Sequence, residues 1–260
     1  MRRCLVVLAA VVGGCDPDLP RARTEAPPDL DAGRSDARAE AAAPGDASRD
    51  GVAGDAAPEA SPDSSTSPHL VDGVNDFGPG ETLATSSTTP NLYRAFIAWD
   101  AANVYFGFEG IDVGPGASAS KFVLIYLDGA NGTTTGLRYN TQQPTLPFGA
   151  RYHLRWKTDR TYTNAQEWTG AAWTDATVSV PITAAASGSF VEMSVARAAI
   201  GNPSRLKVHM SMIIEAPGSE WTYAGVPSTS FTDGANRNYT KYYDFDLGSA
   251  QAPNAYAPLP

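Results

Sequence analysis

The tryptophans are the residues of this 260-residue sequence whose side-chain chemistry stands out. A flat indole ring can stack on the apolar C–H face of a sugar ring, while polar neighbours bind the sugar hydroxyls. Trp99 lies in an apolar run with Phe96 and Ile97, so we expect it to pack in the core. The candidates for sugar binding are Trp156, Trp168, Trp173 and Trp221.

Two of these tryptophans are close in sequence. Trp168 and Trp173 flank Thr169 and Gly170, a pair typical of a tight turn, which would bring both rings to one edge of a sheet. The same rings could equally serve to cover the end of a β-sandwich. Both interpretations stay open, and Trp168 and Trp173 are the first residues to test for binding.

Oxygen-rich loops supply candidate ligands for calcium, which prefers carboxylate and amide oxygens. The candidates are Asp72, Asn75, Asp76 and Asp128, with Asn131 beside the last of them. Turn formation explains the same residues, because short polar side chains accept hydrogen bonds from their own backbone. Calcium is therefore a candidate structural ion, and no other cofactor is expected.

The sequence gives little support for catalysis. The three histidines are His69, His153 and His209, and we interpret the last two as polar residues on alternating strands. No G-x-S-x-G motif is present to supply a nucleophile. A glycosidase needs two carboxyl groups at a set distance. With 16 acidic residues after residue 68, such a pair could arise by chance, and none of these residues has a distinctive sequence setting. We therefore expect no enzymatic activity.

The first residues resemble the signal peptide of a bacterial lipoprotein. Arg2 and Arg3 precede a short apolar run at 5–12, and Gly13 and Gly14 precede Cys15. This resemblance implies cleavage after residue 14 and acylation of Cys15 with palmitate-type chains, which anchor the protein to a membrane. An ordinary secretory signal with a chance cysteine is the alternative. Cys4 would leave with the signal, so no disulfide is expected.

The lipidated Cys15 and the linker that follows it are expected to occupy residues 15–68. Residues 16–68 contain 13 Ala, 8 Pro and 12 acidic residues but no aromatic residue. Such a segment buries too little apolar surface to fold, so we expect a disordered stalk. Its 53 residues would span about 40 Å as a random coil. A folded domain at 69–248 and a flexible tail at 249–260 are expected to follow.

Short runs of β-forming residues separated by turns predict strands in the domain. The expected strands are 93–100, 104–109, 121–128, 150–157, 176–182, 190–195, 206–214 and 241–247. The run at 206–214 alternates apolar and polar residues, as in a half-buried strand. Residues 196–200 suggest one helical turn, closed by Gly201 and Pro203. The fold class predicted from this pattern is all-β, an antiparallel β-sandwich.

Four motifs resemble, in order, those of family 9 carbohydrate-binding modules and their DOMON-like relatives. They are 71–77 (VDGVNDF), 98–107 (AWDAANVYFG), 121–128 (KFVLIYLD) and 190–195 (FVEMSV) followed by 196–201. The proline usual after the glutamate strand is absent, and Ala196 or Arg197 stands there. The resemblance implies a jelly-roll-like sandwich that binds sugars without catalysis, often with structural calcium.

Some DOMON relatives bind haem through methionine and histidine. Met193, Met210, Met212 and His209 are available here, but the three methionines fall on the apolar sides of their strands. Packing in the core is therefore the better interpretation.

The formal net charge of −9 argues against nucleic acid as a partner, because phosphate binding needs concentrated Lys and Arg. Together these features predict non-catalytic binding of a polysaccharide at the bacterial cell envelope. The protein would be held at the outer membrane or cell surface by its lipid anchor. The alternative is a structural or protein-interaction module that keeps the fold without a working sugar site.

Overall fold

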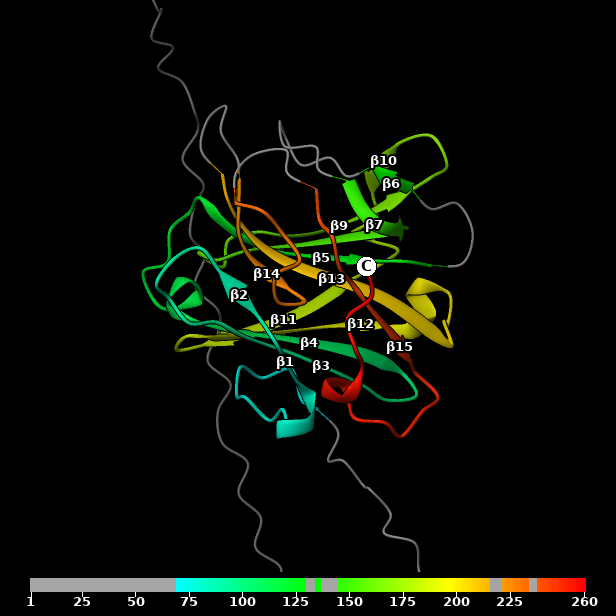
Figure 1. Ribbon diagram of the computed structural model, residues 1–260, viewed down its shortest axis with the longest axis horizontal. Helices are drawn as coiled ribbons and strands as arrows, with labels where there is room; N and C mark the ends of the chain where they lie inside the picture. The colour runs from blue at the N-terminus through cyan, green and yellow to red at the C-terminus, as the bar shows by residue number, and fades with distance from the viewer. Residues whose placement is uncertain (1–68, 130–133, 137–144, 216–220, 234–237) are drawn as a thin grey trace, which may run out of the picture. The chain divides into compact units, whose positions relative to one another are not determined.

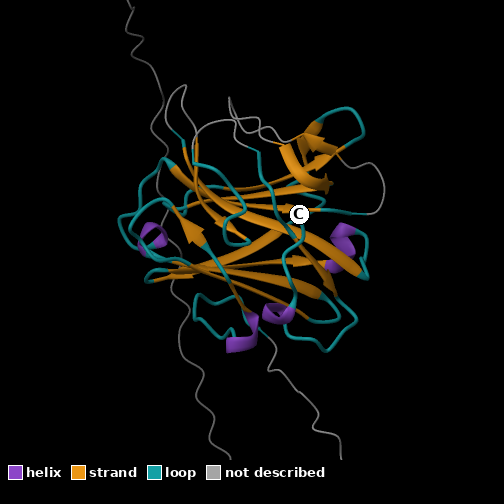
Figure 2. Cartoon of the chain, in the orientation of Figure 1, coloured by secondary structure: helices purple, strands orange, loops and turns teal. Residues whose placement is uncertain are grey.

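Antiparallel strands form almost all of the regular structure in the computed structural model, which describes residues 69–129, 134–136, 145–215, 221–233 and 238–260. Cys15, the expected signal peptide and linker, and Asn131 lie outside these residues. Figure 1 shows two stacked sheets, and Figure 2 shows that loops connect the strands at their ends. None of the described helices has the length and apolarity needed to cross a membrane.

One layer is a five-stranded antiparallel sheet whose centre is the hairpin β3–β4. Its order is β1 (Thr82–Leu83), β3 (Arg94–Trp99), β4 (Asn103–Glu109), β12 (Phe190–Ala196) and β11 (Ile182–Ser187). Phe106 lies opposite Ile97 on one side and Met193 on the other. This register lines up the apolar side chains of three strands on one face.

The second layer is an eight-stranded antiparallel sheet. Its order is β10 (Trp173–Asp175), β9 (Thr163–Trp168), β8 (Tyr152–Lys157), β5 (Lys121–Leu127), β13 (Arg205–Ile214), β14 (Trp221–Val226) and β2 (Ser86–Ser87), with β15 (Tyr243–Asp246) also beside β13. β15 pairs with the first part of β13, and β14 pairs with the later part. The predicted antiparallel sandwich is confirmed.

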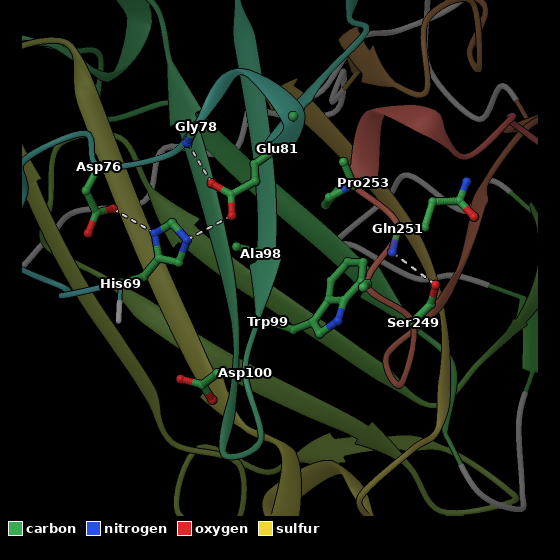
Figure 3. A pocket seen from close by; sticks show the side chains of 13 residues that line it. His69, Asp76, Gly78, Glu81, Ala98, Trp99, Asp100, Ser249, Gln251 and Pro253 are labelled. Carbon is green, nitrogen blue, oxygen red and sulfur yellow. Dashed lines mark hydrogen bonds and ion pairs between the residues drawn. The ribbon is translucent and has the colours of Figure 1, made fainter. Parts of the chain in front are cut away.

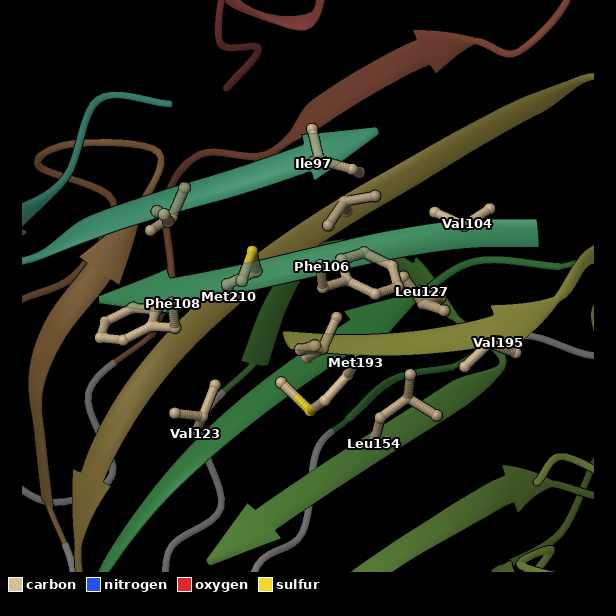
Figure 4. Packing of buried hydrophobic residues seen from close by; sticks show 14 of the residues in the cluster. Ile97, Val104, Phe106, Phe108, Val123, Leu127, Leu154, Met193, Val195 and Met210 are labelled. Carbon is tan, nitrogen blue, oxygen red and sulfur yellow. The ribbon is translucent and has the colours of Figure 1, made fainter. Parts of the chain in front are cut away.

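The main core lies between the two sheets. Figure 4 shows Phe106 and Met193 of the five-stranded sheet packed near Leu127, Leu154 and Met210 of the other. The methionines at positions 193, 210 and 212 are all buried there, as their strand positions predict. Packing between the sheets accounts for these thioethers.

The outer face of the eight-stranded sheet is buried as well. A small sheet of β6 (Thr134–Gly136) and β7 (Thr145–Ala150) contributes Phe148 to a second cluster with Phe122 and Tyr126. His153 and His209 on this face are fully buried, so the expectation of a polar, half-exposed face is wrong. Burial holds the pKa of both imidazoles below its usual value.

In the part of the chain that the structure describes, four short 3₁₀ helices complete the fold: η1 (Pro79–Glu81), η2 (Ile111–Val113), η3 (Arg197–Ile200) and η4 (Pro253–Ala255). The expected turn before Gly201 is η3, and Gly201 ends it in the left-handed conformation, with φ 86°. Left-handed backbone is typical of glycine at the end of a helix.

Two sequence-based expectations about loops are wrong. Residues 176–181 lie between strands, and the chain turns at 177–179, where Asp175 accepts the Thr177 N–H and the Val180 N–H donates to the Ala176 carbonyl. The segment 249–260 is packed rather than loose: Pro253 is buried, and Tyr256 packs against the main core. Leu259 pairs with Tyr242.

A matched pair of leucine substitutions tests the core. Leu154 is fully buried between the sheets, whereas Leu92 is 90 % exposed. Leu154→Ala should lower the free energy of unfolding by about 2–5 kcal/mol, because it leaves a cavity. Leu92→Ala should change it by less than about 0.5 kcal/mol. Chemical denaturation measures both, and equal effects would contradict this packing.

Candidate functional site

A buried carboxylate connects four parts of the sandwich. Asp112 in η2 accepts hydrogen bonds from the hydroxyls of Tyr93 and Tyr223, and its Oδ1 lies 2.5 Å from the Lys121 ammonium nitrogen. Burial alone would raise the pKa of Asp112, but Lys121 and the tyrosine hydroxyls hold it below its usual value. Asp112 is therefore an anion that fixes its partners in place.

A β-bulge directs Tyr223 toward this carboxylate. Met212 pairs with Ala224, whereas the next residue, Ile213, pairs with Thr222, so Tyr223 is an extra residue in β14. Bulges of this kind change the direction of a side chain and occur often beside functional sites. Burial and Asp112 raise the pKa of the Tyr223 phenol, which remains a protonated donor.

A groove of about 280 Å³ lies over this group, at the edge where β14 meets β2. Its walls include Trp221, Tyr223, Lys121, Asp233 and the hydroxyl-bearing Thr88 and Thr89. Trp221, Ile214 and Lys121 occupy one row across β14, β13 and β5. The half-buried indole of Trp221 thus lies beside a fixed ammonium group, a carboxylate and two hydroxyls. Lys121 keeps further N–H donors beyond the one held by Asp112.

The structure brings Trp168 and Trp173 together, as the sequence predicts. They are cross-strand partners in the β9–β10 hairpin, with ring centroids 5.8 Å apart and planes inclined at 63°. Gly170 has φ 97° in the connecting turn. The ring of Trp173 also packs against the second cluster. This hairpin lies at the edge of the sheet opposite the strands that carry the groove.

Trp156 does not present its ring to a ligand. It is only 3 % exposed, within the main core between the sheets. On β8, Leu154 and Trp156 face inward, whereas His153 and Arg155 face the other side, so strand alternation decides the outcome. The prediction that Trp156 binds sugar is therefore wrong, because its ring is buried in the core.

The candidate calcium ligands near the start of the domain are engaged with protein donors. Asp72 accepts the Val74 N–H and Asn75 accepts the Phe77 N–H, so both form turns to their own backbone. Asp76 accepts the Leu70 N–H and pairs with His69. Within the described ranges, no three acidic, histidine or cysteine side chains converge to hold a metal. Turn formation and the ion pair with His69 account for the positions of these three residues in the structure.

Asp128 also has a structural setting, on the other sheet. Its Oδ1 accepts the backbone N–H of Lys207 at 2.8 Å, just beyond the end of β5. Burial raises the pKa of Asp128 to about 6. This carboxyl group extends the pairing of β5 with β13 and is not grouped with the other candidate ligands.

His69 bridges two carboxylates at the start of the domain. Its Nδ1 lies 2.8 Å from Asp76 Oδ1, and its Nε2 lies 3.0 Å from Glu81 Oε1. The ring also packs against Phe77 and Tyr105. The Glu81 hydrogen bond, opposed by burial and aided by Asp76, raises the pKa of His69 to about 9.

This bridge should give the protein a pH-dependent stability. The pKa of His69 in the folded state, about 9, exceeds its unfolded value of 6.5. Its stabilisation is therefore complete below pH 6.5 and is lost as the pH rises through about 9. His69→Gln should lower the free energy of unfolding by about 1–3 kcal/mol at pH 6, and by much less at pH 10. Denaturation of parent and variant at both pH values measures this, and a pH-independent difference would contradict it.

Comparison with known proteins finds only distant structural similarity. No family model matches the sequence, and no curated protein matches it. A family 9 carbohydrate-binding module from Caldicellulosiruptor kristjanssonii in complex with cellotriose is 14 % identical, with a TM-score of 0.34 over 60 % of this chain and 77 % of that chain. A family 9 carbohydrate-binding module from the same organism in complex with glucose is 14 % identical, with a TM-score of 0.32 over 56 % of this chain and 70 % of that chain. Similarity at this level assigns neither a ligand nor site residues to this chain.

Proposed function

We propose that this protein binds carbohydrate without catalysis, and that the groove at Trp221 is its binding site. The observation that carries the proposal is the half-buried indole beside polar groups held in place by the buried Asp112. A sugar ring could stack its apolar face on the indole, while Lys121, Asp233 and the two threonines bind its hydroxyls. Because the protein already fixes Lys121 and Tyr223, little ordering is required when a ligand binds.

Two carboxyl groups with a raised pKa have structural partners. Among the residues that the structure describes, the carboxyl groups with a raised pKa are Asp128 and Glu192. Glu192 accepts the N–H groups of Asp72 and Gly73, and Asp128 accepts that of Lys207. Each therefore connects backbone segments inside the fold, whereas a glycosidase needs its acid at the substrate.

The tryptophan pair of the β9–β10 hairpin is the second candidate surface for the same function. Trp168 and Trp173 lie side by side and are both half-buried. Their mutual contact is also what stabilises an antiparallel pair of strands. The groove has fixed polar groups beside its ring, and we therefore place the binding there.

A comparison of two sets of variants tests the site. Full-length parent protein is first screened on an array of polysaccharides and oligosaccharides. Trp221→Ala should weaken binding of the best glycan about 5–30-fold, since a stacked ring contributes on the order of 1–2 kcal/mol. The double variant Trp168→Ala/Trp173→Ala should bind like the parent.

Circular dichroism and denaturation curves show whether each variant keeps its fold. Loss of binding in the hairpin variant alone would move the site to that hairpin. If the folded parent binds no glycan with or without calcium, the alternative of an interaction or structural module is favoured.

We further propose that the protein acts at the bacterial cell envelope, anchored through acylated Cys15. Weak binding to a repeating polysaccharide becomes firm when many anchored copies bind together. In bacterial cells, Cys15→Ala should move the protein from the detergent-extracted membrane fraction to the soluble fraction and abolish palmitate labelling. Cys4→Ala, at the other cysteine of the chain, is the matched control and should remain membrane-bound. A Cys15→Ala protein that stays on the membrane would contradict lipid anchoring.

A further inference from the structure

A larger cavity, of about 580 Å³, lies elsewhere on the domain. The N-terminal segment 69–81 forms one wall, the end of β3 forms the floor, and the segment 249–253 forms the other wall. Figure 3 shows His69 between its carboxylates on one side, Gln251 and Pro253 on the other, and Trp99 between them. Asn254 donates a hydrogen bond to the Pro79 carbonyl and ties the two walls together. A cavity of this size is within the roughly 300–1,000 Å³ that ligand pockets occupy.

The aromatic floor of this cavity is Trp99, the last residue of β3. Its ring packs against Phe245, with centroids 5.5 Å apart, and against Tyr256 at 6.5 Å. The ring is nevertheless only partly buried, and its remaining surface lines the cavity. A rigid indole surface therefore faces an open space large enough for a sugar ring.

The charged groups around this floor are mainly negative. Asp100 follows Trp99, and its carboxylate accepts the N–H groups of Ala102 and Asn103 and the hydroxyl of Tyr105. These bonds offset the effect of burial, so the pKa of Asp100 lies below its usual value and the group is an anion.

The His69 side of the cavity adds to this negative charge. Asp76 and Glu81 contribute two more carboxylates, and His69 contributes one positive charge. Three carboxylates against one imidazolium leave a net charge of −2 on the lining side chains, and Arg197, which donates a hydrogen bond to the Asp100 backbone carbonyl, reduces the local charge to −1. All three carboxylates are held by hydrogen bonds from the protein, so they cannot move away from an approaching anion.

We propose that this cavity is a second saccharide site, selective for an amino sugar with a free ammonium group. The sugar ring would lie on Trp99, and the ammonium group would be attracted by the carboxylates that line the cavity. Cation–π attraction and the negative walls both favour a cation there, whereas uronic acids and phosphorylated sugars would be repelled. The inference takes saccharides as the ligand class from the proposed function but places them in a separate site.

The test measures binding of three methyl glycosides to the full chain by calorimetry or saturation-transfer NMR. The probes are methyl glucosaminide, its N-acetyl derivative and methyl glucuronide, which differ in charge on a similar ring. Methyl glucosaminide should bind about tenfold more tightly than the neutral derivative, and methyl glucuronide should bind least. Equal binding of all three, or no binding of the glucosaminide, would overturn the proposal.

Variants then locate the binding. Ala250 is an exposed residue of the cavity wall, so Ala250→Trp should block the cavity and weaken glucosaminide binding at least about tenfold. Ala184→Trp places the same ring on the exposed face of β11 and is the matched control. Asp100→Asn should reduce the preference for methyl glucosaminide over its N-acetyl derivative. This variant tests the cavity even if Ala250→Trp does not fold. Unchanged binding in the folded cavity variants would overturn the proposal.

Two further arms separate this inference from the proposed function. Trp221→Ala should leave glucosaminide binding intact, and Ala250→Trp should leave the array glycan bound at the groove. Loss of glucosaminide binding in Trp221→Ala would assign both ligands to the groove and overturn the second site alone. An Nα-acetyl-lysine amide, which keeps its ε-ammonium group, would show that the cavity recognises any ammonium group if it binds as tightly as the glucosaminide. That result would overturn the assignment of the cavity to sugars.

Discussion

Burial of the Asp112 carboxylate is the constraint on which the groove depends. A buried charge is costly unless it is paired and hydrogen-bonded. Asp112 meets this requirement through Lys121 from β5, Tyr93 before β3 and Tyr223 from the bulge in β14. Lys121 and Tyr223 belong to the eight-stranded sheet, and Tyr93 directly precedes a strand of the five-stranded sheet. Satisfying one carboxylate therefore also fixes the corner of the sandwich where Trp221 lies. The same contacts that stabilise the fold therefore orient the side chains proposed to meet a ligand.

Burial of the eight-stranded sheet on both faces gives these sites a rigid support. The central strands β5 and β13 contribute to the main core on one face and to the second cluster on the other. The groove begins at one end of this strand pair, where β5 starts at Lys121 and β13 ends at Ile214. The Trp99 cavity has a different support, because the N-terminal and C-terminal segments close over the end of β3. The two proposed sites thus depend on separate parts of the fold and can be tested one at a time.

The sequence predicts strands well where a run of β-forming residues is bounded by turn residues, as in β4, β5, β12 and β13. It fails where local hydrogen bonds decide the conformation, as at 177–179, where the bonds from Thr177 to Asp175 and from Val180 to Ala176 form a turn. His153 and His209 are buried because β7 and Tyr239 pack over their face of the sheet. These segments come from other parts of the sequence, so the alternation of residues within one strand predicts an exposed face instead.

The candidate site could be predicted only in part. The Trp168–Trp173 pair is local and follows from one hairpin, whereas the burial of Trp156 depends on which face of β8 meets the other sheet. Lys121, Tyr223 and Asp112 converge through strand order and a bulge, and nothing in their local sequence indicates this. Trp99 packs on the core, as its apolar neighbours suggest, yet it also lines a cavity because the segment 249–253 folds back beside it.

The most direct measurement is an NMR titration that follows the indole N–H signals of all five tryptophans as the best array glycan is added to the full chain. Each tryptophan has a different setting: Trp221 in the groove, Trp168 and Trp173 in the hairpin, Trp99 at the cavity and Trp156 in the core. The account predicts that the Trp221 signal shifts in proportion to binding while the buried Trp156 signal stays in place. Saturable binding that leaves Trp221 unmoved and shifts Trp168 and Trp173 instead would contradict it.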